Sequence, residues 1–200
     1  MPIRLNGSTS GYVELAAPAV AGSTVLELPT DSIKPGLVLV AAQSFSAVSA
    51  VNFDGCFTSD YENYLILIGV TGSSASDSDI TFRLRLAGSD ITTASYNADR
   101  IVQFGATLVG QDYSGSSALG LVNLSSAGPW SSSELSVFRP AVADETVILA
   151  KSYGRNNAGE LYHDHRACQH TQATAYDGFS IYVTSGNFTG NIHVYGYRKA

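Results

Sequence analysis

The sequence is poor in charged residues, in cysteine and in long apolar runs, and each shortage excludes a class of protein. Charged residues make up 14% of the 200 residues and hydrophobic residues 44%, a balance too apolar for an intrinsically disordered chain. The formal net charge is −6 and the 11 basic residues are scattered, so the concentrated cationic surface that binds nucleic acid is missing. We therefore expect a folded protein that does not bind nucleic acid.

Cysteine is rare and the N-terminal stretch lacks a long apolar segment, and both features bear on whether the protein is secreted or bound to a membrane. Cys56 and Cys168 are the only cysteines and lie far apart, unlike the dense disulfide framework of small secreted domains, so we expect free thiols. The N-terminal stretch "MPIRLNGSTS" contains no long apolar run. We therefore predict neither a secretory signal nor a membrane anchor, and no membrane partner.

Catalytic motifs are missing as well. The stretch "GSTSG" places Thr9 where a G-x-S-x-G elbow needs serine, and no G-x-x-x-x-G-K phosphate loop occurs. Cys56 lies between two phenylalanines in "FDGCFTSDY", where a buried structural thiol is commoner than a nucleophile. Paired carboxylates for glycoside hydrolysis stay open, since they need only be close in space. We predict that the protein is not an enzyme and uses no cofactor.

Strand patterns fill most of the chain. In "TFRLRLA" the alternation predicts a half-buried strand in which Phe82, Leu84 and Leu86 point inward and the arginines between them stay in water. The continuous apolar runs at residues 64–70 and 146–152 predict central strands covered on both faces. On this reading Leu67, in the first run, belongs to the core.

The spacing of the strand patterns predicts the fold class. Residues 178–186 and 191–199 are rich in aromatic and β-branched residues and are separated by "SGNFTG", which predicts a hairpin. Further strand patterns recur at short intervals between Gly- and Ser-rich turns. We predict an all-β protein, an antiparallel β-sandwich resembling a jelly roll.

The first 35 residues differ from the rest. They are rich in Ser, Thr, Ala, Gly and Pro, lack an aromatic residue after Tyr12 and cannot form a core of their own. We predict an extended N-terminal docking arm at residues 1–35 and a β-sandwich domain at residues 36–200. The arm would bind a partner by strand addition through its apolar residues. These residues are Tyr12, Val13, Leu15, Val25, Leu26 and Leu28. Alternatively, the arm adds edge strands to its own sandwich.

The stretch "LYHDHRACQH" holds most of the potential metal ligands, namely His163, His165, Cys168 and His170. Imidazole and thiolate are the ligands that zinc prefers. On a strand, however, the first two histidines share one face and the other two residues share the opposite face, and few soft ligands lie elsewhere. We predict no bound metal and an ordinary polar strand. A histidine cluster at a trimer axis, which would make assembly sensitive to pH, is the alternative.

Two further candidates carry weaker signals. Asp77 and Asp79 in "SASDSDI" could bind calcium, but they lack the glycine turn and the additional acidic ligand of a full oxygen shell. Trp130 lies in a Ser/Gly/Pro loop and suits glycan stacking or a protein contact, or it closes one end of the sandwich.

Both ends of the chain resemble proteins of tailed bacteriophages. The stretch "GYVELAAPAVAGSTVLELPT" resembles a segment of structural proteins of these phages, including cyanophages. The stretch "GLVLVAAQSFSAVSAVNFDGCFTSDYENYLILIG" resembles the start of a β-rich domain of phage tail-fibre and capsid-decoration proteins, and "FTGNIHVYGYRK" is similar to the last strand of that group. Residues 87–159 carry no such motif. The resemblance implies a virion component of β-sandwich type that forms a homotrimer.

The resemblance leaves the place on the virion open. It implies a capsid decoration or cement protein, bound to the major capsid protein or other virion proteins on the particle surface after synthesis in the host cytoplasm. The alternative is a short tail-fibre or tail-tip protein that recognises a host surface glycan, and a third interpretation is a β-sandwich hydrolase acting on surface polysaccharide. The short chain without a repetitive shaft, together with an arm suited to lie on a surface, favours decoration.

Overall fold

The computed structural model describes residues 3–6, 12–15, 36–74, 78–124, 130–155 and 159–199. The chain divides into two compact units, Met1–Lys34 and Pro35–Ala200. In the first unit, β1 (Ile3–Asn6) pairs with β2 (Tyr12–Leu15) in an antiparallel two-stranded sheet. The sequence did not predict this hairpin. These two strands pair with each other. The alternative prediction was that the arm adds edge strands to the sheets of its own sandwich.

The second unit consists of two antiparallel sheets. In spatial order the eight-stranded sheet contains β3 (Leu37–Val48), β15 (Phe188–Arg198), β5 (Tyr61–Ser73), β11 (Ser131–Phe138), β12 (Thr146–Arg155), β13 (Leu161–His170), β8 (Tyr96–Phe104) and β9 (Thr107–Ser116). The five-stranded sheet contains β10 (Leu119–Leu124), β6 (Ser78–Leu86), β14 (Gly178–Val183) and β4 (Ala50–Phe53), with β7 (Ser89–Asp90) paired to β6.

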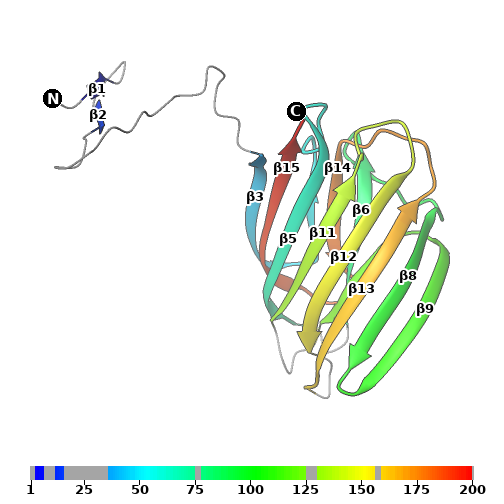
Figure 1. Ribbon diagram of the computed structural model, residues 1–200. Coiled ribbons are helices and arrows are strands. Elements are labelled where there is room, and N and C mark those ends of the chain that lie inside the picture. The colour runs from blue at the N-terminus through cyan, green and yellow to red at the C-terminus, as the bar shows by residue number, and fades with distance from the viewer. Residues whose placement is uncertain are drawn as a thin grey trace, which may run out of the picture. The chain divides into compact units, whose positions relative to one another are not determined.

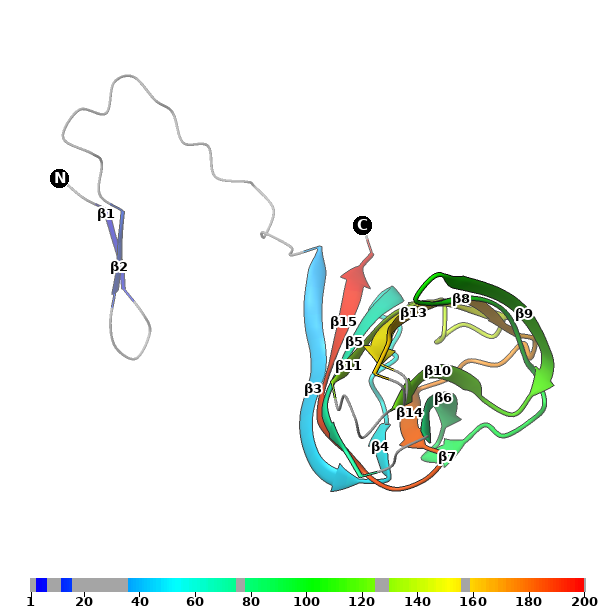
Figure 2. The same cartoon turned by 90° about the horizontal axis from the view of Figure 1, so that it is seen from below.

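The two sheets pack face to face as a sandwich (Figure 1). The eight-stranded sheet curves around the smaller one (Figure 2). Between them, the Phe179 ring stacks on Phe53 and Phe82 with ring centroids 4.9 Å and 5.5 Å apart. The chain crosses repeatedly from one sheet to the other, for example at β3 to β4, at β5 to β6 and at β14 to β15. The prediction of an all-β antiparallel sandwich is confirmed. No helix that could span a membrane occurs in the described part of the chain.

The prediction that the two continuous apolar runs are covered on both faces is wrong for the described chain. In β5 and β12 burial alternates, so that every second side chain points into the sandwich. Leu67 is only partly buried, and Val147 and Leu149 are 40% and 44% exposed on the opposite face. The reason is that the second sheet covers one side of this sheet, and no described segment of the same unit covers the other.

The strand β6 departs from the predicted alternation at its end. Arg85 is buried with 7% exposure, and Leu86 is 38% exposed, the reverse of the prediction. The Arg85 guanidinium donates to Asp54 Oδ1 at 2.7 Å and also pairs with Asp90. Two carboxylates therefore compensate the buried charge, which sequence alternation alone does not reveal.

The predicted hairpin at the C-terminal end is also wrong. β14 lies between β6 and β4 in the smaller sheet, whereas β15 lies between β3 and β5 in the larger sheet. The stretch "SGNFTG" therefore connects the two sheets. Turn residues mark a change of direction in both cases, so they do not distinguish a hairpin from a crossing between sheets.

Candidate functional site

The eight-stranded sheet exposes large apolar side chains on the face that points away from the smaller sheet, which we call the outer face. Strand alternation and register place nine such residues there. They are Leu37, Leu39, Ile101, Leu108, Val147, Leu149, Tyr153, Leu161 and Tyr197. Shallow hollows of about 310 Å³ lie on this face around Ala167, where the small side chain leaves space between Leu149 and Ile101. The outer face is therefore unusually apolar for a solvent-facing sheet surface.

The histidine-rich stretch forms β13, as the sequence predicted, and its residues divide between the faces as expected. His163 and His165 lie on the outer face with ring centroids 5.5 Å apart. Neighbouring strands place Tyr153 and Gln103 beside His163, and Lys151 and Ile101 beside His165. No acidic residue is directly paired with either histidine across the strands. The cross-strand neighbours of the two imidazoles are therefore neutral or basic.

The other two candidate ligands of β13 point into the sandwich. His170 is fully buried, its Nδ1 lies 3.0 Å from the Tyr176 hydroxyl, and its ring packs against Tyr96 with centroids 4.4 Å apart. Burial lowers the pKa of His170 to about 4. Burial raises the pKa of the Cys168 thiol to about 12. Both residues are core members with neutral side chains near pH 7.

The candidate metal ligands are not brought together. His193 lies in the same cross-strand row as His165, four strand spacings away, which at about 4.8 Å each is roughly 19 Å. Within the residues that the structure describes, no group of three or more His, Cys, Asp or Glu side chains could hold a metal ion. For calcium, Asp79 is exposed on β6, and Asp77 lies outside the described residues. The prediction of no bound metal stays a prediction.

A second candidate site lies on the inner side of β13 and β8. The Asp164 carboxylate is fully buried and accepts hydrogen bonds from two guanidiniums. Arg100 Nε donates to Asp164 Oδ2 at 2.8 Å, and Arg166 donates from Nε and Nη2 at 3.1 Å and 2.7 Å. This charge-assisted network fixes both arginines, because moving either one would leave the carboxylate short of donors.

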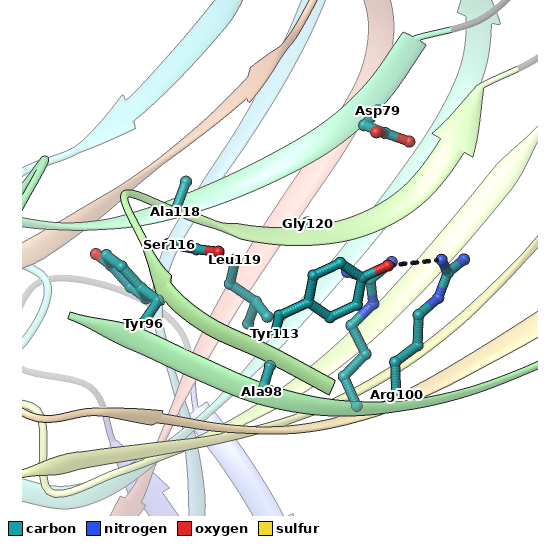
Figure 3. A pocket seen from close by; sticks show the side chains of 10 residues that line it. Asp79, Tyr96, Ala98, Arg100, Tyr113, Ser116, Ala118, Leu119 and Gly120 are labelled. Atoms are coloured by element: carbon teal, nitrogen blue, oxygen red, sulfur yellow. Dashed lines mark hydrogen bonds between the residues drawn. The ribbon is translucent and has the colours of Figure 1, made fainter. Parts of the chain in front are cut away.

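The edge strand β9 adds polar contacts to Arg100. Its Nη1 donates to Gln111 Oε1 at 2.9 Å and to the Tyr113 hydroxyl at 3.4 Å, and that hydroxyl donates to Gln111 at 2.8 Å. Figure 3 shows the Tyr113 hydroxyl directed at the Arg100 guanidinium. Burial lowers the pKa of Arg100, but Tyr113 and the charge of Asp164 outweigh it, so the pKa lies above its usual value. The guanidinium stays charged.

A β-bulge in β10 forms the opposite wall. The register of β10 against β6 shifts between Gly120 and Val122, and Tyr162 from the other sheet fixes this region by donating to the Asn123 carbonyl at 2.8 Å. A Cβ atom at Gly120 would lie 2.9 Å from Arg166 Nη1. Glycine at this position therefore leaves room for the guanidinium, and bulges often occur beside functional sites.

These elements enclose a pocket of about 210 Å³ between the two sheets, which we call the arginine pocket (Figure 3). It is lined by Asp79, Tyr96, Ala98, Arg100, Tyr113, Ser116, Ala118, Leu119, Gly120 and Arg166. The sequence analysis missed this pocket, because its members come from strands far apart in the chain and match no motif. A weak signal was the presence of the oppositely charged Asp164 and Arg166 within the histidine stretch.

The remaining candidates lie apart from the arginine pocket. Trp130 is 47% exposed, and the Arg155 guanidinium lies over its ring, 5.7 Å from the centroid. Cys56 is buried, and its Sγ lies 3.8 Å from the Phe53 carbonyl oxygen. Burial raises the pKa of its thiol to about 12. Both cysteines are free. Cys56 therefore has the surroundings of a structural thiol.

The predicted partner-binding residues of the arm lie in the first unit. Tyr12, Val13 and Leu15 belong to β2, of which only the backbone is described, whereas Val25, Leu26 and Leu28 lie outside the described residues. The docking role of the arm remains a prediction.

Comparisons with known proteins add little to this description. No protein-family model matches the chain, and no curated protein matches it. Among solved structures, the chain is similar to the CBM2 module of the evolved Dit of Lactobacillus casei BL23 phage J-1, with 9% sequence identity and a TM-score of 0.26. That likeness covers 76% of this chain and 69% of the other. At this TM-score it supports no conclusion about function, which must come from the residues themselves.

Proposed function

We propose that the protein is a structural component of a bacteriophage particle, a capsid decoration or cement protein that forms a homotrimer through the outer face. The resemblance of both chain ends to phage structural proteins supports the virion assignment. The observation that carries the proposal is the apolar outer face, with Leu149, Ile101 and Leu161 exposed by 44%, 56% and 57%. Large apolar side chains exposed on one sheet face favour a protein contact, although the outward residues of β11, Ser132, Glu134 and Ser136, are polar.

A second copy of the chain is the occupant that the outer face fits best. The uncovered apolar side chains extend across the sheet, from Leu39 on β3 to Leu108 on β9, so the cover must itself be broad. In a homotrimer the outer faces of three copies would meet around the threefold axis, so that each face is covered by its two neighbours. At the centre of the face Lys151 and Glu134 form an exposed ion pair of 3.4 Å, which presents both signs of charge to a neighbour.

The test of this proposal is the copy number of the protein in purified particles of its phage. Quantitative mass spectrometry against the major capsid protein should find hundreds of copies per particle. A handful of copies would contradict a decoration role. That result would favour a tail-fibre or tail-tip protein.

The tail-tip alternative has one observation in its favour, the arginine pocket. Its buried ion network and its polar lining go beyond what packing two sheets requires, since Asp164 and two arginines replace the apolar contacts found elsewhere between the sheets. A receptor-binding protein needs such a site, whereas a cement protein needs only its contact surfaces. The copy number of the protein in purified particles distinguishes the cement function from the tail-tip function.

A further inference from the structure

We propose that the arginine pocket binds a sugar that carries a carboxylate, such as the uronic acid unit of a polysaccharide. The site is separate from the outer face, because Ala98, Arg100 and Arg166 lie at positions of β8 and β13 that point toward the smaller sheet. The proposal therefore does not depend on how the protein assembles.

The two guanidiniums retain hydrogen-bond donors for a ligand. Asp164 occupies Nε of Arg100 and Nε and Nη2 of Arg166, and Arg100 Nη1 binds Gln111 and Tyr113. Within the described part of the chain, Arg100 Nη2 and Arg166 Nη1 have no hydrogen-bond acceptor, and both residues line the pocket. A carboxylate accepts paired N–H groups of this kind in short, charge-assisted bonds. The arginines are held in place before the ligand arrives, which reduces the entropic cost of binding.

The remaining lining fits the body of a sugar. The Tyr113 ring offers a flat apolar surface for the C–H groups of a pyranose ring, and the Arg166 guanidinium carbon lies 5.9 Å from its centroid. The Ser116 hydroxyl and the Asp79 carboxylate also line the pocket and can accept hydrogen bonds from sugar hydroxyls, although Asp79 Oδ1 already accepts one from Asn123 Nδ2 at 3.2 Å. A volume of about 210 Å³ suits one sugar unit, not a long ligand held entirely inside.

The charges favour a single carboxylate over a simple multivalent anion. Arg100 and Arg166 contribute two positive charges, and Asp164 and Asp79 contribute two negative charges, so the formal charge of the site is zero. Inorganic phosphate would gain two guanidiniums, but its larger negative charge near neutral pH would be repelled by Asp79 more strongly than a single carboxylate would be. A sugar acid offers its carboxylate to the arginines and its hydroxyls to Asp79.

The test compares glucuronic acid with glucose, which has a hydroxymethyl group in place of the carboxylate. Calorimetry and amide NMR titration of the full chain should show glucuronic acid binding at least about tenfold more tightly than glucose, because the charge-assisted bonds are lost with the carboxylate. The shifted resonances should include the Gly120 amide and the Nε–H groups of Arg100 and Arg166. Inorganic phosphate should bind more weakly than glucuronic acid.

Variants connect binding to the pocket. Gly120→Val places side-chain atoms where Arg166 Nη1 lies, and Arg166→Lys keeps the charge but removes the planar pair of donors; each should weaken glucuronic acid binding about tenfold or more. Arg139→Lys, at an exposed arginine paired with Glu62 and Asp144, is the matched control and should bind like the native protein. Amide spectra of each variant establish that it is folded.

Three outcomes would overturn the proposal. They are equal affinity for glucose and glucuronic acid, tighter binding of phosphate than of the sugar acid, or unchanged binding in both folded pocket variants. Such a result would remove the support that the arginine pocket gives to the tail-tip alternative, whereas the test of the assembly proposal is copy number. A low copy number, in turn, leaves the pocket proposal intact.

Discussion

At the scale of single residues, a buried carboxylate organises the polar network between the two sheets. Asp164 has no exposure, and its charge is compensated by two arginines of neighbouring strands. A buried carboxylate with this arrangement is stable only as a complete network, because each partner removed leaves an uncompensated charge. Asp164 therefore holds the arginine pocket together.

Replacing Asp164 by asparagine tests this role. Asp164→Asn would leave Arg100 and Arg166 largely buried without a counter-charge and should lower the free energy of unfolding by about 3–5 kcal/mol. Denaturant unfolding measures the change. Asp112→Asn, at an exposed position of β9, is the matched control and should change stability by less than about 0.5 kcal/mol. A loss of unfolding free energy in Asp164→Asn as small as that in the control would mean that the network does not stabilise the fold.

His170 gives a pH dependence with a defined sign. Its pKa is about 4 in the folded protein and near 6.5 when unfolded, so the unfolded chain binds a proton first as the pH falls. The native protein should therefore lose up to about 3 kcal/mol of stability between about pH 6.5 and pH 4, and none from this group above pH 6.5. His170→Phe should remove that part of the pH dependence, as measured by urea unfolding at several pH values. His163→Gln, on the outer face, should keep it, and a native slope retained in His170→Phe would refute the assignment.

At the scale of strands, the alternation of β5 determines which of its side chains point into the core of the sandwich. Ile66 is fully buried, whereas Leu67 lies on the outer face and is only partly buried. The sequence could not separate them, because both belong to one continuous apolar run. Uniform apolar composition indicates burial on both faces but does not say whether the cover comes from the same chain.

Aspartate substitutions at these two positions should therefore differ. Ile66→Asp would bury an unpaired carboxylate and should cost several kcal/mol or prevent folding. Leu67→Asp should cost roughly 1 kcal/mol in the isolated subunit, because the carboxylate can reach water. Thermal unfolding of the dilute protein measures both. Equal losses at the two positions would contradict the assignment of faces.

The sequence predicted most strands but not their partners. The face division of β13 followed from period-two alternation alone, and the structure agrees with it. Alternation did not predict that β14 and β15 lie in different sheets, nor that Arg85 is buried. Strand pairing and charge compensation involve residues that are distant in the chain. The same reason hid the arginine pocket, whose walls come from β8, β9, β10 and β13.

At the scale of the whole molecule, we propose that the two units have separate functions. The core begins after Pro35, and its two sheets are complete without the first unit. Deleting Met1 to Lys34 should therefore leave a folded sandwich with an almost unchanged thermal midpoint that no longer binds phage particles. Co-sedimentation with particles measures binding, and the full chain is the control. Full particle binding by the truncated protein would refute the docking role of the arm.

We propose that the outer face is a contact between copies of the chain, which sedimentation analysis can test. The native protein should sediment at three times the chain mass of 21.0 kDa, and Leu149→Lys, at the centre of the outer face, should shift it to the monomer while remaining folded. Leu86→Lys, at an exposed leucine of the smaller sheet, should remain trimeric. A native protein that is monomeric at every concentration, or a trimer that Leu149→Lys leaves intact, would contradict the claim.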